Sequence, residues 1–363
     1  MPFAPSRKTY LTPTPPTVMN TQQRLLSTVA FTATLLWSAA PAEAQIDRVY
    51  TFESSSASAG KVIAVNKNGV TIKAGSNDKN FLANQIRKIL FQGDPPELTR
   101  GRELAIDGQY EQAIEELKTI NADQLSRDVI KADVAYYRLL SRAKMALAGQ
   151  YDRNAAKAEA TAFGKNHGNS YHFFSVVKLL GDLELASKNY DGAVRMYGYL
   201  AKAPSPETQI LSRYLTGMAM LQKDDIEGAQ KVFSEVVAVD VNTSDALRLK
   251  ILSKAGQAIT LCKAGKVDEG VKQVEQLITE LNPTDIEMSA KIYNAQGQCY
   301  EAGGDLEGAI LAYLHTHLMF SGAGDAHAEA LTRLVQLWPK VGRTERAAAA
   351  RQELQQRYPG YAN

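Results

Sequence analysis

The side chains best suited to chemistry in this sequence are its histidines and cysteines. His315 and His317 are two residues apart, a spacing that turns the two rings to different sides of a helix, so they do not share a metal ion. His167 and His172 flank a short loop and have no carboxylate in register with them. We therefore expect these four rings to be solvated or packed, and we predict no metal site.

Cys262 and Cys299 fall in the first helices of two successive units of a sequence repeat. An exported protein meets an oxidising environment, which allows a disulfide. Aligned on their units, however, the two residues occupy positions that face differently, and neighbouring helix axes lie about 8–10 Å apart. We expect buried thiols, with a disulfide as the alternative.

The sequence contains no G-x-S-x-G elbow, P-loop, H-E-x-x-H motif or glycine-rich dinucleotide turn. Paired carboxylates such as Glu115-Glu116 and Asp224-Asp225 stand where a solvated face or a turn is expected. We therefore predict a protein that is not an enzyme, with no catalytic residue and no cofactor.

The charge of the chain argues against a nucleic-acid partner. The formal net charge is +2. Residues 1–44 contain Arg7, Lys8 and Arg24 against Glu43, so the remainder holds 38 basic and 38 acidic residues. Binding to phosphate backbones normally requires a clustered basic excess. At 363 residues, 45% hydrophobic and 22% charged, the chain instead has the composition of a globular protein of two or three domains.

The first 44 residues are typical of a signal peptide with an upstream extension. From Met19 a polar start is followed by an apolar stretch over Leu25–Trp37 and then by Ala42-Glu43-Ala44. This order predicts a secretory signal cut after Ala44, with Met19 as the translation start. Downstream of about Arg100 no stretch of 18 or more apolar residues occurs, so no transmembrane segment is expected in the mature chain. We expect a periplasmic or secreted protein.

Residues 45–93 alternate between apolar and polar side chains, which predicts short strands. Asn68-Gly69 is typical of a two-residue hairpin turn in which both residues have positive φ. Four or five strands, with a one-turn interruption near Asn84 before the last, resemble a small SH3-like or Sm-like β-barrel. Because fewer than fifty residues make a marginal core, we expect this barrel to pack against the C-terminal part of the chain, as a cap or docking module.

A short pattern recurs seven times in the rest of the chain. A glycine or a polar turn is followed by an aromatic or aliphatic residue and, three places later, by a small one; the second unit, with Asn154, and the seventh, with Thr344, fit least well. The seven pairs are Tyr110 and Ala113, Tyr151 and Asn154, Tyr190 and Ala193, Ile226 and Ala229, Val267 and Gly270, Leu306 and Ala309, and Thr344 and Ala347.

This pattern meets the needs of an antiparallel helix pair. A left-handed residue ends the first helix, the aromatic or aliphatic side chain wedges between the helices, and the small residue lets their backbones approach. Large residues follow the small position by four places at Leu117, Tyr197, Phe233, Val274 and Tyr313. A second close-contact position inside the first helix is predicted at Gly101, Gly181, Gly217, Ala258 and Gly297.

Over residues 97–358 the sequence resembles the tetratricopeptide-repeat (TPR) family, in about seven units. The units are 36 to 41 residues long, against 34 in the family. The predicted fold class is mainly α, a TPR-like α-solenoid of helix-turn-helix repeats preceded by a small β-barrel. The resemblance to exported repeat proteins of bacterial envelopes implies a non-catalytic scaffold for protein–protein interaction in the cell envelope. The alternative is a structural subunit of the envelope that assembles with itself.

Stacked helix pairs form a concave face lined by one stripe of each first helix. The family resemblance implies that other envelope proteins or peptides bind on this face. Transferring the register of the family's groove to this chain gives nine candidate binding residues: Arg102, Tyr136, Leu139, Lys178, Asp182, Tyr214, Met218, Asn294 and Gln298.

Overall fold

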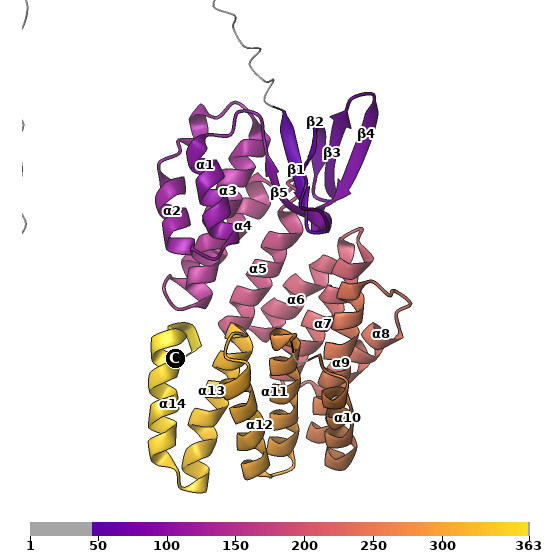
Figure 1. Cartoon of the computed structure of the whole chain (residues 1–363), viewed down its shortest axis with the longest axis vertical. Helices are drawn as coiled ribbons and strands as arrows, with labels where there is room; N and C mark the ends of the chain where they lie inside the picture. Colours follow the sequence, from indigo (N-terminus) through magenta and orange to yellow (C-terminus); the bar gives the residue numbers. More distant parts are fainter. Residues whose placement is uncertain (1–45, 283, 362–363) are drawn as a thin grey trace, which may run out of the picture. The chain divides into compact units, whose positions relative to one another are not determined.

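The computed structural model describes residues 46–282 and 284–361 (Figure 1). The predicted signal peptide and its extension, residues 1–44, lie outside the described residues. Among the described residues, no helix combines the length and the apolar character needed to cross a membrane.

The described residues begin with a five-stranded antiparallel sheet in the order β4-β3-β2-β1-β5. Its strands are β1 (Asp47–Thr51), β2 (Ser58–Asn66), β3 (Gly69–Ala74), β4 (Asn77–Leu82) and β5 (Ile86–Leu90). The predicted one-turn interruption before the last strand is the 3-10 helix η1 (Ala83–Gln85). Among the described residues no pairing joins β4 to β5, so the sheet keeps two edges where a closed barrel would have none.

The hairpin between β2 and β3 differs from the prediction. Asn66 pairs with Gly69, so the two turn residues are Lys67 and Asn68, and Gly69 is already part of β3. None of these residues has positive φ, and the backbone N–H of Asn68 instead donates to the Asn66 side chain at 2.8 Å. Gly69 is needed for space, because a Cβ there would lie 2.0 Å from the carbonyl oxygen of Phe81.

Fourteen helices follow within the described part of the chain, and they pair in antiparallel fashion along it (Figure 1). They are α1 (Pro96–Ile106), α2 (Tyr110–Lys118), α3 (Asp128–Leu147), α4 (Arg153–Asn166), α5 (Phe173–Ala186), α6 (Tyr190–Tyr199), α7 (Pro206–Gln222), α8 (Ile226–Ala238), α9 (Ser244–Lys263), α10 (Val267–Thr279), α11 (Ile286–Ala302), α12 (Leu306–Met319), α13 (Gly324–Leu337) and α14 (Thr344–Arg357). Short 3-10 helices lie at Ala122–Gln124 (η2), Leu200–Lys202 (η3), Trp338–Val341 (η4) and Pro359–Tyr361 (η5).

The seven predicted helix pairs are confirmed by the turns that separate their helices. Every turn holds one residue in the left-handed conformation. Five are glycines and two are Lys188 and Asp224, with φ of 58° and 68°. The predicted close contacts are also present. A Cβ placed on Gly101, Gly181, Gly217 or Gly297 would come within 2.5 to 2.6 Å of the side chain of Leu117, Tyr197, Phe233 or Tyr313, respectively.

The second pair departs from the predicted register by two residues. Asp152 caps α4 and accepts the backbone N–H of Ala155 at 2.6 Å, so the helix begins at Arg153 and not at Tyr151. Asn154 is therefore exposed, and the buried small residue is Ala156.

The sheet and the first helices share one hydrophobic core. Val49, Ile72 and Ile89 from the sheet pack in the same cluster as Leu98 of α1 and Tyr137 of α3. This shared core explains how so short a β segment is stabilised, since it has too few residues for a core of its own.

The end of the last pair contacts the second pair. The backbone N–H of Gly360 donates to the carbonyl of Ala148 at 2.9 Å, and Arg153 donates to the carbonyl of Gly360 at 2.6 Å. A Cβ at Gly360 would lie 2.1 Å from the carbonyl oxygen of Leu147, so this approach requires glycine. The contact joins the two ends of the stretch from α3 to η5, which therefore surrounds a central space.

Candidate functional site

A cavity of about 1570 Å³ lies inside the stretch from α3 to η5. Residues of α5, α7, α9, α11 and α13, the first helices of five successive pairs, form most of its wall. This volume exceeds the 300–1,000 Å³ typical of sites for small molecules. The cavity, which we call the central cavity, is large enough for a segment of polypeptide.

Six of the nine candidate binding residues line the central cavity: Lys178, Asp182, Tyr214, Met218, Asn294 and Gln298. They come from α5, α7 and α11, the first helices of the third, fourth and sixth pairs. The register transferred from the TPR family thus brings these six residues to one surface. Whether they bind a partner stays a prediction.

Arg102, Tyr136 and Leu139 do not line the central cavity. Arg102 is fully buried under the sheet, in ion pairs with Asp94 and Asp133. Leu139 is buried in the core formed by α3, α4 and α5. The ring of Tyr136 stacks on His172, with centroids 3.6 Å apart. Arg102 and Tyr136 are covered because the sheet and the loop before α5 pack on the first two pairs, which the repeat pattern does not include, whereas Leu139 is covered by the packing of α3, α4 and α5.

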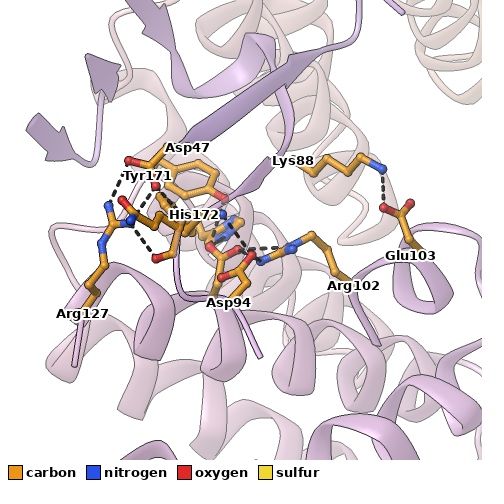
Figure 2. Close-up of polar contacts among 11 residues, drawn as sticks. Asp47, Lys88, Asp94, Arg102, Glu103, Arg127, Tyr171 and His172 are labelled. Carbon is orange, nitrogen blue, oxygen red and sulfur yellow. Dashed lines mark hydrogen bonds and ion pairs between the residues drawn. The ribbon is translucent and has the colours of Figure 1, made fainter. Parts of the chain in front are cut away.

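Asp94, Arg102, Tyr171 and His172, labelled in Figure 2, belong to a buried polar group centred on Asp133. Arg102 donates to Asp94 and to Asp133, at 2.9 Å each. The other oxygen of Asp133 accepts from Tyr171 at 3.0 Å and lies 2.9 Å from Nε2 of His172. We call these five residues the Asp133 cluster. Because the residues that make it are buried and bond to one another, its role is to join the loop after β5, α1, α3 and the turn before α5.

The pKa values in the Asp133 cluster follow from burial and pairing. Burial lowers the pKa of His172 below its ordinary value, so the ring is neutral at neutral pH. Burial alone would raise the pKa of Asp133, but the hydrogen bond from His172 and the charge of Arg102 outweigh it and lower that pKa. The sequence analysis found no carboxylate in register with His172. Asp133 reaches it from another helix, 39 residues away.

One wall of the central cavity presents a polar patch. Gln298 donates to one oxygen of Glu329 at 2.8 Å, and Asn294 donates to the other at 3.2 Å. Burial raises the pKa of Glu329 above its ordinary value. Among the described residues, the side-chain oxygen of Asn294 has no hydrogen-bond partner although it is buried. This patch therefore offers a free acceptor beside a carboxylate.

A second polar patch of the lining lies on α5 and α6. Lys178 and Tyr197 both bond to Asp182, at 2.8 and 2.9 Å. Around the whole cavity nine basic residues face seven acidic ones, interspersed with tyrosines and apolar side chains. Such a balanced lining suits a chain with mixed side chains better than a strongly charged ligand.

Several residues of the lining are not among the nine candidates that the groove register gives. Glu329 and Arg333 belong to α13, a first helix from which no candidate was chosen. Arg153 and Tyr361 reach the cavity only because the last turn contacts the second pair. The groove register could have suggested the first two, but no local pattern could have suggested the others.

The remaining residues singled out for chemistry are mostly packed. Cys262 and Cys299 are buried free thiols, as predicted. His315 stacks on Tyr293, with centroids 3.9 Å apart. His317 does not meet His315 but lies beside a histidine of the next helix, His327.

No protein-family model matches the sequence. No curated protein matches it either. Among solved structures, the chain is similar to a tetratricopeptide repeat protein from Parabacteroides merdae ATCC 43184, with 16% identity, 72% of this chain and 91% of that chain covered, and a TM-score of 0.52. It is also similar to a Rap protein, with 13% identity, 74% and 76% of the two chains covered, and a TM-score of 0.50. The fold is therefore a TPR-like helical solenoid with a small N-terminal sheet.

Proposed function

We propose that the protein is a non-catalytic interaction scaffold that holds an extended segment of a partner protein in the central cavity. The observation that carries this proposal is the lining itself. It combines tyrosines, Met218 and paired polar side chains from five successive helix pairs. Extended peptides are recognised by such mixtures, in which polar groups bond the backbone and apolar surfaces take up alternate side chains. The similar Rap protein was crystallised in complex with Competence and Sporulation Factor.

The free acceptor on Asn294 supports a peptide as the occupant. A buried, unpaired side-chain oxygen costs free energy that a backbone N–H from a ligand would recover. Met218 adds an adaptable apolar contact, since its unbranched side chain fits surfaces of different shapes. The partner we propose is therefore an unfolded tail or loop of another protein.

A phage-displayed library of random peptides tests this proposal. We expect the immobilised protein to enrich peptides that bind one per chain. Replacing Tyr214 and Met218 together by Ala should weaken the enriched peptides about thirtyfold or more, because aromatic anchors commonly contribute 2 kcal/mol or more. The matched control is the Leu311→Ala, Leu318→Ala double variant, whose residues are exposed on α12 outside the cavity.

Circular dichroism of both double variants shows whether they fold. Since Tyr214 is largely buried, a Met218→Ala, Gln298→Ala double variant provides a second cavity change at half-buried positions. Failure to enrich any peptide, or equal affinity in folded cavity variants and in the control, would contradict the proposal.

We also propose that the protein is exported and works in the bacterial cell envelope. The support is the order of residues from Met19 to Ala44, an apolar stretch followed by a small-x-small cleavage site. The intact mass of protein from the native host should correspond to a chain that begins at Gln45. Recovery of a chain that still carries residues 19–44 from the soluble fraction would contradict export.

The alternative function, a subunit that assembles with itself, is favoured by one surface feature. Leu311, Leu318 and Met319 of α12 are 67%, 68% and 66% exposed, and the spacing of seven residues between the two leucines places them on the same side of the helix, two turns apart. Light scattering over a concentration series separates the two functions. A monomer supports the scaffold, whereas large assemblies that Leu318→Ser disrupts support the alternative.

A further inference from the structure

The last two helix pairs bring three side chains with metal-binding atoms together. His317 lies in the last turn of α12, His327 in the first turn of α13, and Glu353 near the end of α14. One ligand atom from each lies within 4.8 Å of the other two. Three different helices thus place two imidazoles and one carboxylate around a common point.

The two imidazoles are arranged nitrogen to nitrogen. Nδ1 of His317 lies 2.7 Å from Nε2 of His327, and the ring planes differ by only 2°. Two neutral imidazoles at this distance share one proton, which one ring donates and the other accepts. A metal ion that replaces this proton requires only that the two rings separate slightly.

The carboxylate of Glu353 lies beside the same two rings. Its oxygens are 3.9 Å from Nε2 of His317 and 3.8 Å from Nε2 of His327. Arg357 donates to one of these oxygens at 2.9 Å, so part of the carboxylate's charge is already balanced. The other oxygen is available for a second cation.

A second hydrogen bond orients the buried ring. Nδ1 of His327 lies 2.9 Å from the hydroxyl of Tyr358, whose oxygen can accept a hydrogen bond from the Nδ1–H group. In that tautomer the lone pair of Nε2 points toward His317 and Glu353. Metal-binding histidines almost always have such a partner on the other ring nitrogen, which fixes the tautomer and the orientation.

The three side chains differ in how much of each is exposed to solvent. The side chain of His327 is fully buried, whereas His317 and Glu353 are 24% and 32% exposed. Burial lowers the pKa of His327 to about 4, so its ring is uncharged at neutral pH. One side of the group is therefore held by packing, and the other is open to solvent, from which an ion and a water ligand can enter.

We propose that His317, His327 and Glu353 bind one divalent transition-metal ion of the zinc class, with water completing its coordination. Two imidazoles and one carboxylate form a donor set that zinc uses in proteins, while calcium and magnesium prefer oxygen ligands. The bound ion would link α12, α13 and α14, and so stabilise the C-terminal end of the solenoid. None of the three ligands lines the central cavity, although Tyr358 and Arg357 beside them do. Zinc binding can therefore be tested apart from the proposed function.

Titration of ZnCl2 into the untagged, chelator-treated full-length protein, followed by calorimetry, tests the site. We expect one ion per chain and a rise in melting temperature with Zn²⁺ that Mg²⁺ does not give. His317→Gln and Glu353→Gln should each weaken zinc binding at least about tenfold, and Tyr358→Phe should weaken it by a similar factor through the lost second partner. His315→Gln is the matched control, because that ring lies two residues away on the same helix and stacks on Tyr293.

His327→Gln should abolish the tight zinc binding. Because His327 is buried, however, this substitution carries the greatest risk of impairing folding. His317→Gln and Glu353→Gln therefore carry the test, since both side chains are partly exposed. No zinc binding by the folded wild type would overturn the site. Equal affinity in the His317→Gln, Glu353→Gln and His315→Gln variants would also overturn it, because zinc would then be bound elsewhere.

Discussion

At the scale of single residues, Arg102 shows how the same position can belong to a groove in one repeat and to the core in another. Its place in the repeat resembles that of a groove residue. The sheet covers it, however, and its guanidinium is fully buried between Asp94 and Asp133. Removing one partner of a buried ion pair leaves the others charged and unpaired, which costs more than the pair itself contributes.

Arg102→Met should therefore lower the free energy of unfolding by about 3–5 kcal/mol. Arg100→Met on the same helix is the matched control. Arg100 is 54% exposed and pairs with Glu97 and Glu116 at the surface, so its loss should cost less than about 1 kcal/mol. Urea unfolding at neutral pH measures both. Equal stability of the two variants would show that the Asp133 cluster does not stabilise the packing of α1 against α3.

The Asp133 cluster also predicts a pH dependence. The pKa of His172 is lower in the native protein than in the unfolded chain. Below about pH 6.5, therefore, His172 binds a proton in the unfolded chain more readily than in the native protein. The contribution of His172 to stability is full above that pH and falls as the pH drops. Asp133, whose native pKa is also lowered, adds a loss in the same direction at more acidic pH.

Urea unfolding of the wild type and of His172→Gln between pH 7.5 and 5 tests this dependence. Gln keeps a donor toward Asp133 but does not titrate, so we expect the free energy of unfolding to fall less steeply in the variant. A slope in the variant as steep as in the wild type would mean that His172 is protonated in the native state as readily as in the unfolded chain.

Individual functional residues were the feature least predictable from the sequence. Six groove candidates lie on one surface because α5, α7 and α11 keep the repeat register. The cluster of His317, His327 and Glu353 could not be predicted in the same way. The histidine spacing that drew attention, His315 and His317, joins residues that the helix separates, whereas the true neighbour of His317 comes ten residues later, beyond a turn.

At the scale of the elements, the helix pairs depend on glycines that face large side chains. Phe233 of α8 lies between Gly217 of α7 and Gly256 of α9, and a Cβ on either glycine would come within 2.6 Å of its ring. The contact of Gly217 with Phe233 was predictable from spacing alone, because the glycine and the large residue recur at fixed distances from the turn, whereas Gly256 was not among the predicted positions. The second pair was the exception, since Asp152 is a strong helix cap and moved the start of α4.

Gly217→Ala should lower the free energy of unfolding by about 1–3 kcal/mol, because the added methyl group overpacks the site. Gly198→Ala, also within a helix, provides the matched control. A Cβ there meets no atom within 4 Å, so the substitution should stabilise by about 0.5–1 kcal/mol through helix propensity. Thermal unfolding followed by circular dichroism compares the two. A Gly217→Ala variant as stable as Gly198→Ala would mean that α7 and α8 are less closely packed than their Cβ distances indicate.

The turns between helices allow a change of the opposite sign. Lys188 adopts a left-handed backbone, with φ of 58°, at the place where five other pairs have glycine. Because a side chain in this conformation costs about 1–2 kcal/mol, Lys188→Gly should raise the free energy of unfolding by part of that amount. Gly304→Ala, with φ of 79° and no atom near the new Cβ, should lower it by about 1 kcal/mol. Urea unfolding measures both changes. If both substitutions changed the free energy of unfolding in the same direction, the assignment of a left-handed backbone to these turns would be contradicted.

At the scale of the whole described unit, residues 46–361, the central feature is a solenoid whose last turn contacts its second pair. The hydrogen bond from Arg153 to Gly360 spans 207 residues of sequence. Repeat patterns describe each pair and its neighbours, so they predicted the stacking of pairs but not this contact. Because of this contact, helix pairs surround the space inside the solenoid. The contact also brings Arg153 and Tyr361 into the lining of the central cavity.

The measurement that tests the central claim most directly is photo-crosslinking to a library-selected peptide, with benzoylphenylalanine placed at one of two positions. Met218 lines the central cavity, and Leu311 is 67% exposed on α12 outside it. If the cavity holds the partner segment, the peptide will crosslink from position 218 and not from position 311, and mass spectrometry will place the crosslink within the peptide. Crosslinking from position 311 alone, with the protein folded in both cases, would contradict the account.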